Sequence, residues 1–209
     1  YNIYVNIKRE EQMKTFETLV AERKKQLIQD NLNDLQENLQ NSDYQKKVHN
    51  FATKFGFSVD EVNRAIQDNL FLAACFAKDP SKQNFTEKLV AEVLGVEKLS
   101  PAGENCIRFD ENGDIVSINK GNVSKSADFY IDNRYYTQKY TNETGGAQDN
   151  QYKDVVDFLV KGSKKHLVGA IVDGAYWTSG HKAKLIEMFK DNPNVVITSV
   201  DELRGVKDE

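Results

Sequence analysis

Apolar residues recur at intervals of three and four along the first part of the chain, among lysine, glutamate, glutamine and asparagine. They are Met13, Phe16, Leu19, Val20, Leu27, Leu32, Leu35 and Leu39. This spacing places apolar side chains on one face of an α-helix. The pattern therefore predicts a long helix, and the polar stretch 26–41 indicates that most of it is solvated.

Two shorter helices are expected to follow. The pattern predicts one over 43–54, which Gly56 ends in the way that a C-cap glycine does. Ser58 and Glu61 have the spacing of a capping box, in which each side chain accepts the backbone N–H of the other residue. This motif predicts a third helix that continues to about Phe76. Residues 1–80 are thus expected to form a helical N-terminal region.

The pattern changes after Asp79-Pro80, because the residue before a proline avoids the helical conformation. We expect, in order, a helix over 84–95, a hairpin at Asn112-Gly113, strands over 127–131 and 134–141, a helix over 148–162, a fully buried strand over 168–174, a helix over 181–190 and a strand over 195–198. This order predicts an α/β (α+β) domain over 81–209, with a mixed central sheet and helices on both faces.

Composition narrows the classes of protein that fit this pattern. The 209 residues carry a formal net charge of -4, so no overall basic field favours nucleic acid, and a DNA contact requires a local basic surface. The two cysteines, Cys75 and Cys106, exclude a disulfide scaffold and a four-cysteine zinc site. They fit the reducing cytoplasm, where we expect the protein. The three histidines lie far apart, without metal-ligand spacing.

Neither a membrane span nor a secretory signal is predicted. No apolar run approaches the roughly 18 to 20 residues that a membrane helix needs. The N-terminus lacks the basic, apolar and small-residue order of a signal peptide. We therefore expect no membrane partner. The chain begins at Tyr1 and not at a methionine, which is compatible with a fragment of a longer protein.

The segment 125–155 carries the candidate chemistry. Asp128 lies on one predicted strand and Lys139 on the next, and a short turn joins the two strands. A carboxylate and an ammonium group brought together in this way suit metal-assisted phosphodiester hydrolysis. The carboxylate binds Mg²⁺, which proteins usually hold by one or two carboxylates plus substrate phosphate. The lysine orients the attacking water and offsets charge on the phosphate.

This arrangement resembles the PD-(D/E)xK nuclease superfamily and, within it, the type II restriction endonucleases. The resemblance covers about residues 81–205. It includes a helix with Phe85 and Glu87 before the sheet, Ala127-Asp128 where the family has Pro-Asp, a strand ending in Lys139, and Gly-Gly-Ala-Gln-Asp at 145–149 leading into a helix.

The resemblance implies Mg²⁺-dependent cleavage of double-stranded DNA at a specific sequence. Asp128 is then the metal ligand, Lys139 positions the water, and Glu87 supports the site. A homodimer is also implied, because a palindromic site mirrors the two-fold symmetry of the protein.

The sequence departs from the family two positions before the lysine. An acidic residue is expected there on the same strand face, but the chain has Thr137, a poor Mg²⁺ ligand. The missing carboxylate could come from Glu87, Glu143 or Asp149, or the ion could rest on Asp128 with backbone carbonyls and water. Alternatively, the site is catalytically inactive.

Residues in two segments are candidates for contacts with DNA. The first segment surrounds the loop that follows Lys139. Its amide side chains are of the type that hydrogen-bonds base edges, and its glycines allow the chain to lie close to a phosphate backbone. The candidates there are Gln138, Glu143, Gly145, Gly146, Gln148, Asn150 and Gln151. The segment 51–67 has the spacing of a helix-turn-helix, in which Asn63, Arg64 and Gln67 would read a groove. Amide-rich helix starts also occur without DNA. The same spacing describes any tight pair of helices, including small ubiquitin-binding modules.

Two other functions fit the same residues. One is an endonuclease fold that binds DNA without cleaving it, for which Thr137 is the indication. The other is a protein-interaction domain built on the helical N-terminal region. The effect of salt concentration on binding distinguishes these two functions, because phosphate contacts make DNA binding steeply salt-dependent.

Overall fold

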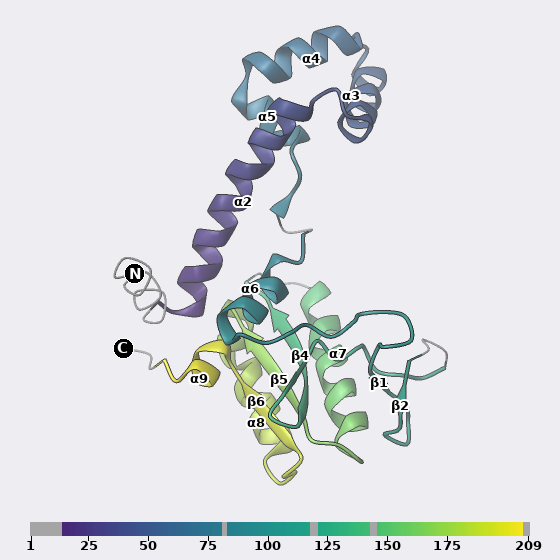
Figure 1. The fold of residues 1–209 in the computed structure, drawn as a ribbon, viewed down its shortest axis with the longest axis vertical. Coiled ribbons are helices and arrows are strands. Elements are labelled where there is room, and N and C mark those ends of the chain that lie inside the picture. The colour runs from purple at the N-terminus through teal and green to yellow at the C-terminus, as the bar shows by residue number, and fades with distance from the viewer. Residues whose placement is uncertain (1–13, 81–82, 118–120, 143–145, 207–209) are drawn as a thin grey trace. The chain divides into compact units, whose positions relative to one another are not determined.

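The computed structural model describes residues 14–80, 83–117, 121–142 and 146–206 (Figure 1). The chain divides into two compact units. Val20–Phe85 form a helical unit, and the residues up to Leu19 together with those from Thr86 form an α/β unit. The two units have separate clusters of buried apolar side chains, as independent domains do.

The helical unit is built from consecutive helices. They are α2 (Phe16–Asn38), whose first turn belongs to the α/β unit, α3 (Ser42–Phe55), α4 (Val59–Asp68) and α5 (Leu70–Phe76). Their apolar faces meet in a core that includes Leu35, Val48, Val62, Ile66 and Ala73. Most residues of α2 are exposed, which confirms the prediction of a long, solvated helix.

The predicted caps are confirmed, but the third helix is shorter than expected. Gly56 ends α3 at φ 76°, and Ser58 and Glu61 form the reciprocal capping box of α4. The expectation of a single helix after this box is wrong, because Asn69 is extended and its side chain accepts the N–H of Leu72. Asparagine side chains compete for backbone groups in this way, which here ends α4 and caps α5.

The α/β unit contains a four-stranded mixed sheet, which confirms the predicted sheet type. Its strands are β3 (Phe129–Ile131), β4 (Arg134–Tyr140), β5 (Val168–Asp173) and β6 (Val195–Thr198), in the order β3-β4-β5-β6. β3 and β4 are antiparallel, whereas β4, β5 and β6 are parallel. The β3–β4 turn has Asp132 and Asn133 at positive φ, as a two-residue hairpin turn requires.

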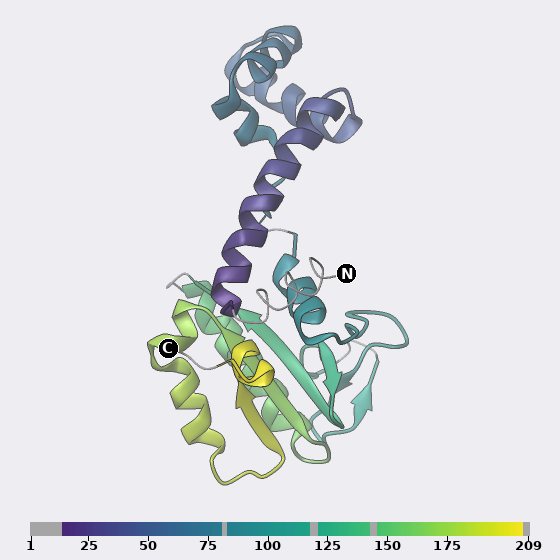
Figure 2. The same ribbon diagram turned by 60° about the vertical axis from the view of Figure 1, so that its left-hand side comes forward.

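Helices connect the strands and cover the sheet (Figure 2). They are α6 (Phe85–Leu94), α7 (Gly146–Gly162), the π-helical turn η2 (Trp177–His181), α8 (Lys182–Phe189) and α9 (Val200–Arg204). All six residues of β5 are buried, so both faces of the sheet are covered, as predicted. Helix α9 was not among the expected elements, although Ser199 and Glu202 form a capping box at its start.

The predicted hairpin at Asn112-Gly113 is present as a separate small sheet. It pairs β1 (Arg108–Phe109) with β2 (Ile115–Val116) in antiparallel register. Gly113 has φ 83°, and a Cβ at this position would lie 2.9 Å from the carbonyl oxygen of Lys161 in α7. The hairpin therefore packs on the end of α7, where only glycine fits this turn.

Candidate functional site

Asp128 is held in place by backbone hydrogen bonds on both sides. It immediately precedes β3, and its N–H donates to the Tyr136 carbonyl over 2.8 Å while its own carbonyl accepts the Leu99 N–H over 2.8 Å. Oδ2 of its carboxylate accepts the Gln138 N–H at 2.7 Å and lies 3.3 Å from the Thr137 hydroxyl. Among the residues that the structure describes, Oδ1 makes no hydrogen bond. One carboxylate oxygen is thus fixed by hydrogen bonds, whereas within the described residues the other is not.

The electrostatic surroundings of Asp128 bring together charged residues that are distant in sequence. Its side chain is 8% exposed, and burial raises the pKa of its carboxyl group. Lys139 and the Gln138 N–H oppose this rise, Glu87 adds to it, and Lys98 also opposes it. Two of the residues predicted to be catalytic, Lys139 and Glu87, therefore lie close enough to act electrostatically on the third, Asp128.

Glu87 and Lys98 form an ion pair beside Asp128. Glu87 lies in the first turn of α6, and Lys98 lies in the segment that follows this helix. The backbone of Lys98 makes an isolated antiparallel bridge with Phe129 of β3, which explains why its side chain is close to Asp128. Lys98 could not be predicted from the sequence, because a single lysine outside any periodic segment carries no signal of such a contact.

Lys139 and Thr137 lie on the same face of β4, since alternate residues of a strand share a face. Lys139 is partly buried, its backbone pairs with β5, and no hydrogen bond or ion pair of its side chain is found within the described ranges. The positive charge of this side chain acts on Asp128. Thr137 is 1% exposed and its hydroxyl contacts Asp128. The position expected to hold an acid thus supplies a second polar contact to Asp128 and no carboxylate.

The carboxylate oxygens at this site are of the kind that Mg²⁺ binds in proteins. The described part of the chain contains no group of three or more His, Cys, Asp or Glu side chains that could hold a metal ion. Glu87 acts electrostatically on Asp128, so these are the two carboxylates that could serve a Mg²⁺ ion, which proteins usually bind through one or two carboxylates plus phosphate and water. Asp149, one of the alternatives for a further carboxylate, contacts Tyr176, and Glu143 lies outside the described residues.

The residues expected to contact DNA differ in their accessibility. Gln138 is 2% exposed and Gln148 is 8% exposed, so neither amide lies at the surface in this arrangement. Oε1 of Gln151 accepts the Thr141 hydroxyl at 2.6 Å, whereas Asn150 is exposed. Gly146 begins α7, and Gly145, like Glu143, lies outside the described residues.

The other two DNA-contact candidates lie in the helical unit, on α4. Asn63 accepts a hydrogen bond from Gln45 of α3 at 3.0 Å. Arg64 is exposed, and its Nε donates to the Asp60 carbonyl at 3.3 Å. The structure therefore assigns Asn63 and Arg64 to a different compact unit from Asp128.

A second buried carboxylate lies at the carboxyl end of β5. Asp173 is 8% exposed, and burial raises its pKa to about 7. Both of its oxygens lie within 3.3 Å of the Val200 N–H, at the start of α9. The negative charge of Asp201 adds to the rise, and Lys182 opposes it. Nothing in the sequence distinguishes Asp173, since an acid after an apolar strand is common.

Comparisons with protein-family models, curated proteins and solved structures found no match for this chain. None of the helices in the described ranges combines the length and the apolar composition needed to cross a lipid bilayer.

Proposed function

We propose that the α/β unit is a Mg²⁺-dependent DNA endonuclease of the PD-(D/E)xK kind, with Asp128 at its active centre. The observation that carries this proposal is a buried carboxylate on which the charges of Lys139, Glu87 and Lys98 act together. Ionisable groups that are perturbed by burial and by specific charged partners concentrate at functional sites.

The order of elements supports the same proposal. A helix with Glu87 precedes an antiparallel pair of strands with Asp128 and Lys139, and α7 then leads to the buried parallel strand β5. This is the order on which the resemblance to restriction endonucleases rests. Site-specific cleavage and a homodimer remain part of the proposal on that ground.

Each residue at the site has a distinct proposed role. Asp128 and Glu87 would hold the ion, which supplies Lewis acidity at a phosphoryl oxygen and a bound water of lowered pKa. The Gln138 N–H and the Thr137 hydroxyl orient Asp128 by fixing Oδ2. Lys139 would orient the attacking water and offset negative charge on the phosphate. Lys98 holds Glu87 through their ion pair.

Thr137 favours a second candidate function. Because its hydroxyl takes the position expected for an acid, the unit would bind DNA through the same surface without cleaving it. Such a module would retain salt-dependent DNA affinity, since counterion release depends on phosphate contacts and not on catalysis.

Digestion of phage DNA by the full chain tests the proposal. We expect discrete fragments with Mg²⁺, and a loss of about a hundredfold or more in Asp128→Asn and Lys139→Ala. Asn at position 128 keeps a hydrogen-bond acceptor, so this variant should remain folded. Lys190→Ala is the control, because Lys190 forms an exposed ion pair with Glu187 on the α8 side.

The result that contradicts cleavage is intact DNA from the parent chain with both Mg²⁺ and Mn²⁺. DNA affinity measured at two salt concentrations then distinguishes the two candidates. DNA binding that weakens steeply as the salt concentration rises supports the non-cleaving module. Absence of DNA binding contradicts both candidate functions.

A further inference from the structure

Helix α9 contacts both a buried carboxylate and the first turn of α2. At the end of β5, the two carboxylate oxygens of Asp173 lie 3.2 and 3.3 Å from the Val200 N–H, at the start of α9. In α9 itself, the carboxylate of Asp201 accepts the Phe16 N–H of α2, at 3.0 Å through Oδ1 and at 2.9 Å through Oδ2. The side chains of Phe16 and Val200 are both buried. Helix α9, yellow in Figure 2, therefore links the end of β5 to the start of α2.

A second contact joins α9 to the same turn. Nη1 of Arg204 donates to the Lys14 carbonyl at 2.9 Å and pairs with Asp201 at 3.1 Å. The helix has only five residues, and a helix this short depends on contacts with other elements, because its own hydrogen bonds do not offset the cost of forming its first turn. Short elements of this kind can open locally while the core of the unit stays folded.

The charge of the Asp173 carboxylate has little to compensate it. The side chain is 8% exposed, and in the part of the chain that the structure describes it accepts a hydrogen bond from the Val200 N–H alone. A buried carboxylate needs several donors or a cation to remain ionised without a large cost in free energy. Burial therefore raises the pKa of Asp173 to about 7, although the Val200 N–H opposes this rise.

Ionisable groups from the neighbouring elements also act on Asp173. Asp201 and Glu202 of α9 add to the rise in its pKa, and Lys182 of α8 opposes it. Lys182 forms an ion pair with Glu202 at 2.7 Å, so its charge already has a carboxylate partner. Tyr140 of β4 interacts with Asp173 as well, but burial raises the pKa of its hydroxyl, which therefore stays uncharged. The surroundings thus favour a neutral Asp173 as long as α9 covers it.

The proton on Asp173 and the position of α9 are linked for this reason. If α9 moves away, water reaches the carboxylate and the ordinary pKa of 3.8 returns. The covered state therefore binds the proton more tightly than the open state. The contribution of Asp173 to keeping α9 in place is complete below about pH 4 and is lost as the pH rises through 7.

We propose that Asp173, α9 and the first turn of α2 form a pH-sensitive latch. In the closed state α9 covers the neutral side chain of Asp173, and Asp201 holds the Phe16 N–H. When Asp173 ionises, α9 opens more often and carries Asp201 away from Phe16, so the start of α2 loses its cap. The hydrogen bond between Tyr140 and Glu17 does not involve α9, so the turn loosens without leaving the α/β unit. The latch is independent of the nuclease activity proposed above.

Amide hydrogen exchange of the full chain, resolved by NMR, tests the latch. After correction for the intrinsic pH dependence of exchange, the Val200 and Phe16 amides should open about tenfold more often at pH 8 than at pH 6. This factor follows from a pKa that is about 7 in the closed state and 3.8 in the open state. The Val168 amide, which donates to the Asn194 carbonyl at the other end of β5, is the internal control and should not change.

Variants separate the two steps of the latch. Asp173→Asn keeps an acceptor for the Val200 N–H and cannot ionise, so the Val200 and Phe16 amides should both lose their pH dependence. Asp201→Ala should release the Phe16 amide at pH 6 while Val200 stays protected. Asp191→Asn, a change at an exposed acid of the same unit, should behave as the parent does.

Several results would overturn the latch. One is equal opening of the Val200 amide at the two pH values, and another is a pH dependence that persists in Asp173→Asn. Rapid exchange of Val200 in Asp173→Asn at pH 6 counts against it too, because a neutral side chain would then not hold α9. A parallel rise at Val168 would show that the whole unit opens. Continued protection of Phe16 in Asp201→Ala would show that α9 does not hold α2.

Discussion

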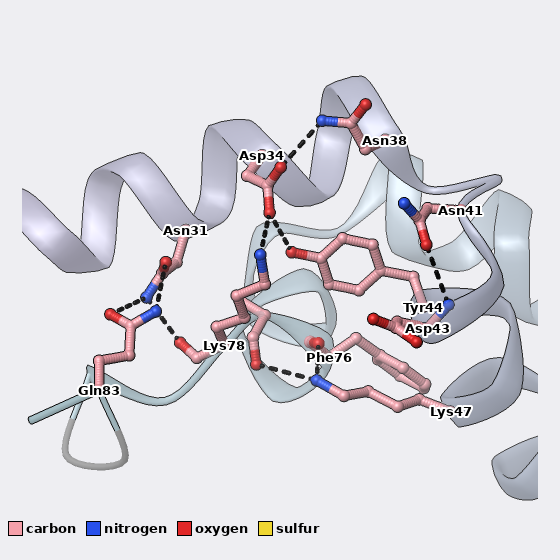
Figure 3. A network of polar contacts seen from close by, with 11 residues as sticks. Asn31, Asp34, Asn38, Asn41, Asp43, Tyr44, Lys47, Phe76, Lys78 and Gln83 are labelled. Atoms are coloured by element: carbon pink, nitrogen blue, oxygen red, sulfur yellow. Dashed lines mark hydrogen bonds and ion pairs between the residues drawn. The ribbon is translucent and has the colours of Figure 1, made fainter. Parts of the chain in front are cut away.

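In the helical unit, the carboxylate of Asp34 lies at the surface between the Lys78 ammonium and the Tyr44 hydroxyl (Figure 3). In the α/β unit, by contrast, Asp128 and Asp173 are each 8% exposed. The hydrogen bonds from Lys78 and Tyr44 lower the pKa of Asp34 to about 2. Burial has the opposite effect on Asp128 and Asp173, whose pKa values are raised.

This difference separates two uses of an acidic side chain. The ionised form of Asp34 stabilises the fold, because it gains partners without losing much hydration. The ionised forms of Asp128 and Asp173 oppose folding, because burial removes water from the charge. A protein that keeps such destabilising groups commonly does so at a site with a task, which is why Asp128 is the centre of the proposed function.

The largest expected effect on stability is at Asp173. Its pKa rises from 3.8 to about 7 on folding, so its stabilising contribution is complete below about pH 4 and is lost as the pH rises through 7. Asp173→Asn keeps an acceptor for the Val200 N–H but removes the charge. We expect the parent to lose on the order of 2 kcal/mol relative to this variant between pH 5 and pH 8.

Urea unfolding at the two pH values measures this difference. Asp191→Asn is the control, since Asp191 is an exposed acid in the same unit and its replacement should preserve the pH dependence of the parent. Equal pH dependence in the parent and in Asp173→Asn would contradict a raised pKa at this position.

A smaller effect is expected at Asn69, which separates α4 from α5. Asn69→Ala removes the side chain that accepts the Leu72 N–H, and loss of such an N-cap costs about 1 kcal/mol. Denaturation followed by circular dichroism checks this cost. Gln67→Ala, an exposed change on α4, should leave stability nearly unchanged. If Asn69→Ala is as stable as this control, the Asn69 cap does not determine where α4 ends and α5 begins.

The smallest effect is expected at Asp34. Since its pKa is lowered, its contribution is present above the ordinary value of 3.8 and is lost as the pH falls through about 2. Asp34→Asn should lower the melting temperature slightly at pH 6 and by less at pH 2, where the contribution is partly lost. High salt should reduce the difference, because exposed charges are screened. Glu37→Gln on the same helix serves as control, and a larger effect at pH 2 than at pH 6 would reverse our interpretation.

The parts of the fold that could be predicted rest on signals within a few residues. Gly56 ends α3, Ser58 caps α4, and the turn at Asp132-Asn133 joins two strands, as the local pattern indicates. The break at Asn69 was missed although its cause is also local, because the apolar pattern continues across it. That Asp128 and Lys139 lie near each other could be predicted because a hairpin brings its two strands together whatever surrounds it.

The sequence alone thus determined the order and type of most elements, since helix periodicity, caps and turns depend on neighbouring residues. Only the tertiary structure decided which charges meet. Lys98 pairs with Glu87 and acts electrostatically on Asp128 because its backbone bridges to β3. The carboxylate of Asp173 is buried at the start of α9, where it is removed from water. Burial and charge proximity are set by contacts between segments far apart along the chain, and for this reason no local pattern contains them.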